Sequence, residues 1–223
     1  MPEAVIFDID GTLVDSVHFH AEAWVKAFKQ YGYDADFDKV RQQIGKGGEY
    51  ILPEFISQEE IEKDGEKISD YRKQYYQENL LDKIKPFPKV RELFERVKAD
   101  GNQIVLASSA RPKTVEYYQE LLGIKDLING VTSRGDVEQA KPNPDIFLAA
   151  LNHFENVSKE SVIVVGDSPY DAEAAEKISL STVGVLCGGY SEDVLKKAGC
   201  IAIYKDPADL LNHYEESPLR AQK

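Results

Sequence analysis

The stretch Ala4–Ser16, AVIFDIDGTLVDS, constrains the fold of this chain more than any other. Four apolar or aromatic residues lead directly into two carboxylates, Asp8 and Asp10, and then into Gly11 and Thr12. An apolar run bounded by turn-forming residues predicts a buried strand. Acids at its carboxyl end would lie where open parallel α/β sheets bind their ligands.

Asp8 and Asp10 stand two residues apart, so on a continuing strand they point to the same side. Two neighbouring anions repel each other unless a cation or a proton lies between them. Mg²⁺ is the expected cation because it is hard and prefers oxygen ligands. The alternative is a strand followed by a plain Asp-Gly turn, and this stretch alone does not decide between the two.

Length and charge narrow the class of protein. A chain of 223 residues can form one large domain or a core with an insert. The formal net charge of −12 disfavours a nucleic-acid partner, because such binding rests on Lys and Arg neutralising phosphates. A local cation can still bind an anionic substrate.

Cys187 and Cys200 are expected to pack in the core without forming a disulfide. The apolar run at the N-terminus is too short for a signal peptide, and no stretch approaches transmembrane length. The sequence therefore predicts a cytoplasmic protein with no membrane partner.

Apolar periodicity divides the chain into a helical part and an alternating part. Between residues 17 and 85 we expect helices at 17–31, 34–44, 51–56 and 57–81. The last of these has Ser57 as its N-cap and Glu60 three residues on. Beyond Pro86 we expect strands at 103–108, 128–132, 161–166, 182–186 and 200–204, and helices at 90–99, 112–122, 143–154, 172–178 and 192–198. The tail after about Tyr214 is expected to fray.

Strands separated by single helices predict an α/β fold with a doubly wound, Rossmann-like parallel sheet. Residues 1–15 and 86–223 would form this core, and residues 16–85 an inserted all-helical domain. Because the insert follows the first strand, it is expected to leave the sheet at its carboxyl end. There it could act as a lid above the acidic pair.

Four places put polar groups at the carboxyl ends of predicted strands. They are Asp8 with Asp10, Ser108 with Ser109, Lys141 in AKPNPD, and Asp167 with Asp171 in GDSPYD. Together they supply a nucleophile, an acid/base, a hydroxyl, an ammonium and further carboxylates for a cation. This inventory suits phosphoryl transfer, in which catalysis is mostly positioning and charge neutralisation.

In these motifs the sequence resembles the haloacid dehalogenase-like (HAD) hydrolase superfamily. DIDGT at 8–12 is similar to the first motif, the strand ending in Ser108 to the second, Lys141 to the third, and GDSPYD at 166–171 to the fourth. The helical insert is similar to the family's cap between the first two motifs. The resemblance points to the phosphatase branch with a helical cap, which includes phosphoglycolate phosphatase-like and β-phosphoglucomutase-like proteins.

The resemblance implies a Mg²⁺-dependent phosphomonoester hydrolase that acts on a small phosphorylated metabolite. Asp8, kept ionised, would attack phosphorus and form an aspartyl-phosphate, while Asp10 would act as general acid and then general base. Mg²⁺ would be held by the Asp8 side chain, the Asp10 backbone carbonyl and Asp167. Ser108 and Lys141 would each contact a phosphoryl oxygen.

Further residues receive supporting roles. Thr12 and Asp171 are expected to support the site, although Asp171 could instead be the N-cap of the helix at 172. Ser109 is the alternative to Ser108 by sequence. The expected substrate contacts from the helical insert are His20, Lys46, Gly47 and Glu49, for which a structural His and a plain interhelical turn are the alternatives.

Two other functions stay open. A β-phosphoglucomutase-type mutase is favoured by His20, which is similar to a His of those enzymes. It is disfavoured by Gly166, where those mutases have an acid, and by a cap loop with Gly and Lys in place of Arg. A non-catalytic binding or regulatory protein is disfavoured because no expected catalytic position is missing. A haloalkanoate dehalogenase is disfavoured because its chemistry needs no metal. The sequence does not name the substrate or the oligomeric state.

Overall fold

The computed structural model describes residues 2–220 and divides into two compact units. The core unit comprises Met1–Asp15 and Pro86–Lys223, and the helical unit comprises Ser16–Lys85. The chain therefore leaves the core unit soon after its first strand and returns to it at Pro86.

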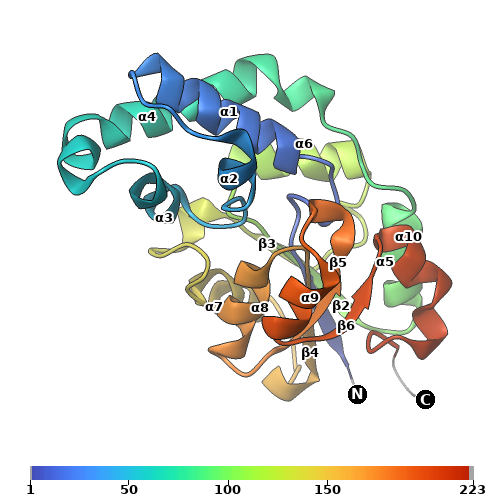
Figure 1. Ribbon diagram of the computed structural model, residues 1–223. Helices are drawn as coiled ribbons and strands as arrows, with labels where there is room; N and C mark the ends of the chain where they lie inside the picture. The colour runs from blue at the N-terminus through green and yellow to red at the C-terminus, as the bar shows by residue number, and fades with distance from the viewer. Residues whose placement is uncertain (1, 221–223) are drawn as a thin grey trace. The chain divides into compact units, whose positions relative to one another are not determined.

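The core unit is built on a six-stranded sheet in the order β3-β2-β1-β4-β5-β6 (Figure 1). Every neighbouring pair of strands is parallel, so the expected doubly wound α/β fold is confirmed. The strands are β1 Ala4–Phe7, β2 Gln103–Ala107, β3 Gly130–Thr132, β4 Val162–Gly166, β5 Ser181–Val185 and β6 Cys200–Tyr204. The order reverses between β1 and β4, and open α/β sheets bind ligands beyond the carboxyl ends of the strands at such a reversal.

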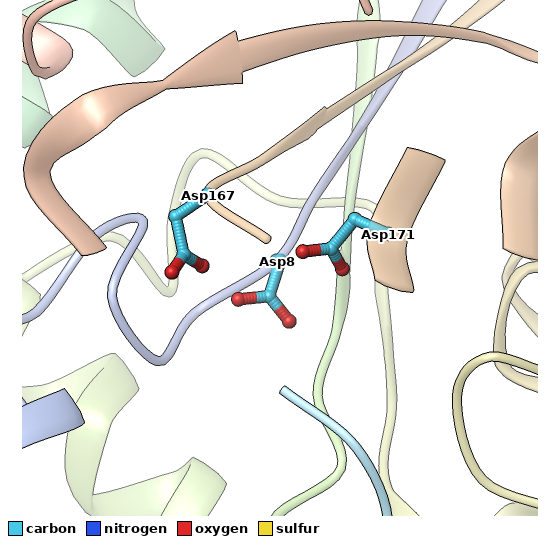
Figure 2. Close-up of side chains that lie close together, drawn as sticks. All are labelled: Asp8, Asp167 and Asp171. Carbon is cyan, nitrogen blue, oxygen red and sulfur yellow. The ribbon is translucent and has the colours of Figure 1, made fainter. Parts of the chain in front are cut away.

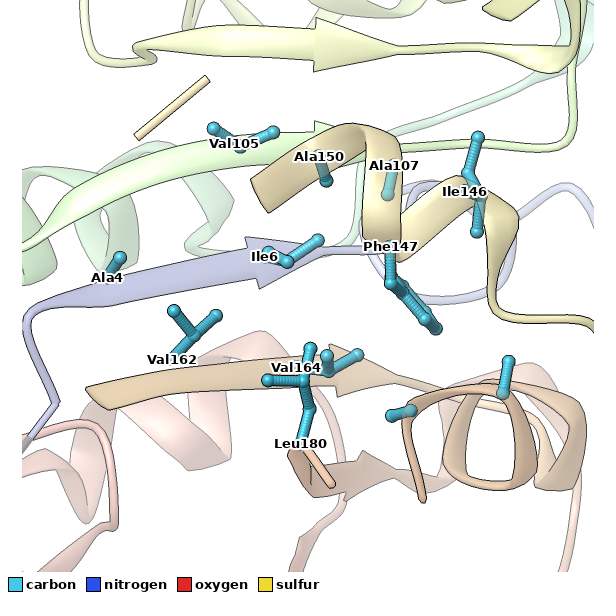
Figure 3. Packing of buried hydrophobic residues seen from close by; sticks show 12 residues of the cluster. Ala4, Ile6, Val105, Ala107, Ile146, Phe147, Ala150, Val162, Val164 and Leu180 are labelled. Carbon is cyan, nitrogen blue, oxygen red and sulfur yellow. The ribbon is translucent and has the colours of Figure 1, made fainter. Parts of the chain in front are cut away.

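Helices cover both faces of this sheet, which explains why β1 is a continuous apolar run. On one face Ile6 lies between its register partners Val105 and Val164, in a cluster that also contains Phe147 of α7 (Figure 3). On the other face the ring of Phe7 lies 4.6 Å from that of Phe94 of α5. The core helices are α5 Val90–Ala99, α6 Pro112–Leu122, α7 Asp145–Leu151, α8 Pro169–Glu176, α9 Glu192–Lys197 and α10 Pro207–Asn212.

The helical unit contains α1 Val17–Gln30, α2 Phe37–Arg41, α3 Gly48–Ile51 and α4 Gln58–Asn79. Its core includes Trp24, Phe28, Val40 and Ile68. Helix α4 begins at the predicted capping box, in which Ser57 and Glu60 each bond to the other's backbone N–H. An inserted all-helical segment is thus present, although α2 is shorter than the predicted helix at 34–44.

Two predictions in the C-terminal half of the chain are wrong. Helix α8 begins at Pro169 and not at residue 172, because Ser168 caps it. The tail does not fray after Tyr214, whose hydroxyl donates to the carbonyl of Leu219 at 3.1 Å. The side chains of Tyr214 and Leu219 are buried. The part of this prediction that concerns residues 221–223 lies outside the described residues. Helix α10 was not predicted.

Among the helices described between residues 2 and 220, none has the length and apolar character needed to cross a membrane.

Candidate active site

The carboxyl ends of β1 and β4 bring two acids together at the reversal of strand order. Asp8 follows Phe7, whose register partner is Val165, and the Asp8 N–H donates to the Val165 carbonyl at 2.9 Å. Asp167 follows β4 directly. Asp171 of α8 is the third member, and one carboxylate oxygen from each acid lies within 4.8 Å of the others (Figure 2).

Lys141 faces this acidic cluster from the loop before α7. Its Nζ lies 2.5 Å from Oδ1 of Asp8 and 2.7 Å from Oδ1 of Asp171. The lysine side chain is only 2% exposed, and Nζ also lies 5.2 Å from the centroid of the Phe147 ring. A lysine this deeply buried needs paired charges, and it has two. Lys141 is therefore a buried, paired lysine and not a solvated loop side chain.

Thr12 joins the two strand-end acids. Its hydroxyl lies 3.0 Å from Oδ1 of Asp167 and 3.3 Å from Oδ2 of Asp8. Gly11, at φ +85°, lets the chain turn sharply after Asp10 so that Thr12 comes back toward Asp8. The single Thr12 proton can serve either carboxylate, so the hydroxyl bridges them.

Asp171 is not the N-cap of α8. Ser168 is the N-cap, and Oδ2 of Asp171 accepts from the Ser168 hydroxyl at 2.6 Å and from its N–H at 3.1 Å. This capping box turns the other oxygen, Oδ1, to Lys141. Gly166 permits the arrangement, because a Cβ there would lie 2.6 Å from Cβ and Cγ of Asp171. Gly188 likewise leaves room for the Asp167 side chain, because a Cβ at position 188 would lie 1.7 Å from Oδ2 of Asp167.

The cluster carries more negative charge than its lysine can balance. Burial raises the pKa of Asp8 to about 7 although Lys141 opposes the shift, and the charge of Asp171 adds to it. Burial and the charges of Asp171 and Asp8 also raise the pKa of Asp167 well above its usual range. Burial alone would lower the pKa of Lys141, but Asp171 and Asp8 outweigh it and hold that pKa above its usual range. Lys141 alone therefore does not keep Asp8 fully ionised at neutral pH.

These residues fit a hard divalent cation. Three buried carboxylates face one ammonium, which leaves a formal excess of two negative charges when all the acids are ionised. Carboxylate oxygens are the donors that Mg²⁺ prefers. The pairing of Oδ1 and Oδ2 of Asp171 with Lys141 and Ser168 leaves Asp8 and Asp167 as the better placed side-chain ligands.

Asp10 belongs to a second group of polar residues. Its Oδ2 lies 3.4 Å from the Ser108 hydroxyl, and its Oδ1 accepts from the Tyr118 hydroxyl at 3.1 Å. Ser108 is fully buried at the end of β2, and Ser109 beside it is partly buried. Tyr118 of α6 was not among the predicted site residues. A tyrosine in an amphipathic helix gives no signal that its hydroxyl reaches another element.

The four candidates from the insert all lie in the helical unit. His20 is buried, with its Nδ1 2.9 Å from a guanidinium nitrogen of Arg72 and its ring stacked on Tyr76 at 4.2 Å. Lys46 pairs with Glu54 at 3.0 Å. Gly47 is the N-cap residue of α3, and Glu49 lies exposed in its first turn. Their contact with substrate stays a prediction.

Fold and site together define an α/β protein with a Rossmann-like core, an inserted helical segment and an acidic centre at the carboxyl edge of its sheet. Residues 5–185 match the family model of the haloacid dehalogenase-like hydrolases. The chain belongs to that family, and the expected resemblance is confirmed.

Relatives of known name cover nearly the whole chain. A phosphorylated carbohydrates phosphatase from Thermotoga maritima is 29% identical over 96% of this chain and 99% of its own. The crystal structure of a hydrolase from Pseudomonas syringae is 32% identical, with a TM-score of 0.84 over 96% of this chain and 98% of that one. The crystal structure of a candidate β-phosphoglucomutase from Thermotoga maritima is 28% identical, with a TM-score of 0.68, and the match covers 96% of this chain and 99% of that one.

Proposed function

We propose that the protein is a Mg²⁺-dependent phosphomonoester hydrolase that works through an aspartyl-phosphate on Asp8. The observation that carries the proposal is the buried set of Asp8, Asp167 and Asp171 around the single ammonium of Lys141. Such a set suits a reaction in which an anionic nucleophile meets an anionic ester, because cations must offset both charges.

Asp8 is the proposed nucleophile. It stands at the end of the central strand, and Lys141 and Thr12 hold its two oxygens, so its carboxylate is fixed in direction. Attack on phosphorus forms the bond from Asp8 to phosphorus and breaks the bond from phosphorus to the ester oxygen. A covalent intermediate divides one difficult step into two easier ones.

Asp10 is the proposed general acid and base. It gives a proton to the leaving oxygen and then takes one from the water that hydrolyses the aspartyl-phosphate. Ser108 would donate to a phosphoryl oxygen, and Lys141 would neutralise charge on the phosphoryl group. Asp171 would act through Lys141, whose position it holds.

The side chains of Asp8 and Asp167, with the backbone carbonyl of Asp10, would hold Mg²⁺, and Thr12 would keep the two carboxylates in place. When bound, the ion supplies positive charge that favours ionised Asp8 and shields it from the ester. Its presence would also lower the raised pKa values of Asp8 and Asp167.

We further propose that the substrate is a small phosphorylated metabolite, with phosphorylated carbohydrates as the first class to test. The support is the near full-length relative from Thermotoga maritima, which is named a phosphorylated carbohydrates phosphatase. In this proposal the core unit supplies the chemistry. The helical unit acts as a cap that selects the substrate through His20, Lys46, Gly47 and Glu49, with Ser109 contributing from the core. A cytoplasmic location and the lack of a nucleic-acid partner stay predictions from the sequence.

The decisive experiment is a panel of phosphorylated metabolites with released phosphate as the readout, run in Mg²⁺ and in EDTA. We expect release from p-nitrophenyl phosphate and from some sugar phosphates in Mg²⁺ only. The matched variants are Asp8→Asn, which should lose turnover, and Asp145→Asn, which makes the same change in the first turn of α7 and should keep it. Turnover by Asp8→Asn would reject Asp8 as the nucleophile.

A sugar-phosphate mutase of the β-phosphoglucomutase type is the second candidate, favoured by the 28% identical structure from Thermotoga maritima. Gly166 argues against the mutase, because those mutases carry an acid at this position and any side chain at position 166 would displace Asp171. Interconversion of glucose 1-phosphate and glucose 6-phosphate faster than hydrolysis of any ester would favour the mutase. Phosphate analogue binding with no turnover across the panel would favour the third reading, a binding or regulatory protein on this scaffold.

A further inference from the structure

Each carboxylate oxygen of Asp10 faces a hydroxyl group. Tyr118 donates to Oδ1 at 3.1 Å, and the hydroxyl of Ser108 lies 3.4 Å from Oδ2. One hydroxyl comes from α6 and the other from the end of β2. Two donors on separate elements fix both the position and the plane of the carboxylate.

Tyr118 is held firmly enough to serve as such a support. It is completely buried, and its ring has few rotatable bonds. Helix α6 starts with Pro112 and ends at Gly123, which takes the left-handed conformation. Arg91 of α5 then donates to the Gly123 carbonyl and pairs with Asp126 at 2.9 Å. The Tyr118 hydroxyl therefore sits on a helix whose C-terminal end is tied to α5.

Ser108 cannot give Asp10 the same constant support. Its Oγ accepts from the Ala110 N–H at 3.0 Å, which leaves a single proton to donate. In the proposed function that proton goes to a phosphoryl oxygen, so it is withdrawn from Asp10 when substrate binds. Of these two hydroxyls, Tyr118 is the one that can stay on Asp10 throughout the reaction.

We infer that Tyr118 is a positioning residue for Asp10, which holds Oδ1 so that the catalytic proton is carried on Oδ2. Because Tyr118 donates to Oδ1, a proton on that oxygen would compete with its hydrogen bond, and Oδ2 is the better site. Oδ2 is also the oxygen beside Ser108, the proposed phosphoryl contact. This inference rests on the proposed function, in which Asp10 is the general acid.

The proton then follows one path in both steps. In the first step it leaves Oδ2 for the ester oxygen as the bond from phosphorus to that oxygen breaks and Asp8 bonds to phosphorus. In the second step water attacks phosphorus and gives a proton to Oδ2. The bond from Asp8 to phosphorus then breaks, which releases inorganic phosphate. Tyr118 keeps its own proton throughout.

The test compares two leaving groups in one enzyme preparation. p-Nitrophenolate leaves readily as an anion, whereas an alkyl leaving group needs a proton from the acid. We expect Tyr118→Phe to lower kcat/KM by about 10- to 100-fold for the best alkyl phosphate of the panel. For p-nitrophenyl phosphate the expected loss is at most about threefold. kcat/KM is the right constant, because it covers the steps up to formation of the aspartyl-phosphate.

The ratio of the two kcat/KM values does not depend on how much of the variant is folded, so a loss of stability cannot imitate the effect. Tyr117→Phe, at the partly buried neighbour in α6, is the matched control and should leave the ratio unchanged. A Tyr118→Phe variant whose two activities fall equally, or do not fall, overturns the inference.

Asp10→Asn separates this inference from the proposed function. If Asp10→Asn keeps full turnover of the alkyl phosphate, Asp10 is not the general acid, and its role in the proposed function fails together with the inference. If Asp10→Asn loses that turnover while Tyr118→Phe leaves the ratio unchanged, only the role of Tyr118 is wrong.

Discussion

Lys141 and Asp171 form an ion pair that water hardly reaches: Nζ lies 2.7 Å from Oδ1, and each side chain is 2% exposed. A buried pair of this kind is weak evidence for stability, but the loss of one partner leaves an uncompensated charge in the interior. Here the second partner of Lys141 is Asp8, the proposed nucleophile. Lys141 thus connects Asp171, in the first turn of α8, to Asp8, just after the end of β1.

Replacement of Lys141 by Met should abolish activity and weaken the fold. The ammonium that offsets Asp8 and Asp171 disappears, so we expect kcat/KM to fall at least 1000-fold and stability to drop by about 3–5 kcal/mol at neutral pH. Urea unfolding and phosphate release measure the two effects. Lys177→Met, at an exposed lysine that donates to the Pro142 carbonyl, is the control and should stay within about 0.5 kcal/mol. An active Lys141→Met enzyme would contradict the proposed site.

Asp171→Asn keeps the shape of the side chain and an acceptor for Ser168 but removes the charge beside Lys141. We expect kcat/KM to fall by about 10- to 100-fold, as is usual for a group that holds a catalytic side chain in place without contacting the substrate. Asp145→Asn is the matched control, because Asp145 also lies in a first helical turn and accepts from a backbone N–H. Equal activity of the two variants would show that Asp171 only caps α8.

Gly166→Ala tests the close approach of Asp171 to β4. A Cβ there would meet Asp171 at 2.6 Å, so the carboxylate must move away from Lys141. We expect a cost of about 1–3 kcal/mol in stability and a clear loss of kcat. Gly135→Ala is the control, because its nearest neighbour would lie at an ordinary 3.4 Å. Wild-type activity in Gly166→Ala would remove the structural argument against an acid at this position.

The strands were the most predictable part of the fold. Strands β1 and β6 have the bounds expected from the sequence, because each is a short apolar run between turn formers, although β6 lies at the edge of the sheet and is only partly buried. The motif at 166–171 was also found, but the start of its helix was not. Ser168 and Asp171 both qualify as N-caps, and only the geometry shows that Ser168 is the cap while Asp171 closes the box from the third helical position.

The parts that could not be predicted depend on long-range contacts. Tyr118 reaches Asp10 across 108 positions of the chain, and no local pattern marks such a partner. The tail looked polar, yet Leu219 is fully buried and its carbonyl accepts from Asn102 and Tyr214. A segment with one buried apolar anchor has too weak a period to be distinguished from a frayed end.

Leu219→Ala should therefore destabilise the core unit, although it lies close to the end of the described chain. Truncation of a fully buried leucine typically costs about 2–5 kcal/mol, and chemical denaturation would measure it. Leu148→Ala makes the same change at a side chain that is 46% exposed, and it should cost at most about 0.5 kcal/mol. Equal stability of the two variants would mean that the tail is not docked in solution.

In EDTA the protein should lose stability as the pH rises from about 4 to 8. The pKa of Asp8 is about 7 in the folded state against 3.8 for an exposed carboxyl, so the folded state binds the extra proton between these values. The stabilisation is complete below the lower pKa and disappears as the pH passes the higher one, and Asp167 acts in the same direction. The shift of Asp8 corresponds to a change on the order of 4 kcal/mol.

Mg²⁺ at neutral pH should restore stability, by about 2.7 kcal/mol at 100 times its Kd. Urea unfolding at pH 5 and pH 8, in EDTA and in Mg²⁺, measures both effects. Asp8→Asn should flatten the dependence on pH and on Mg²⁺, whereas Asp145→Asn should retain it. A wild-type protein that is equally stable at both pH values in EDTA, or indifferent to Mg²⁺ at pH 8, would show that the acidic cluster does not carry the charge proposed for it.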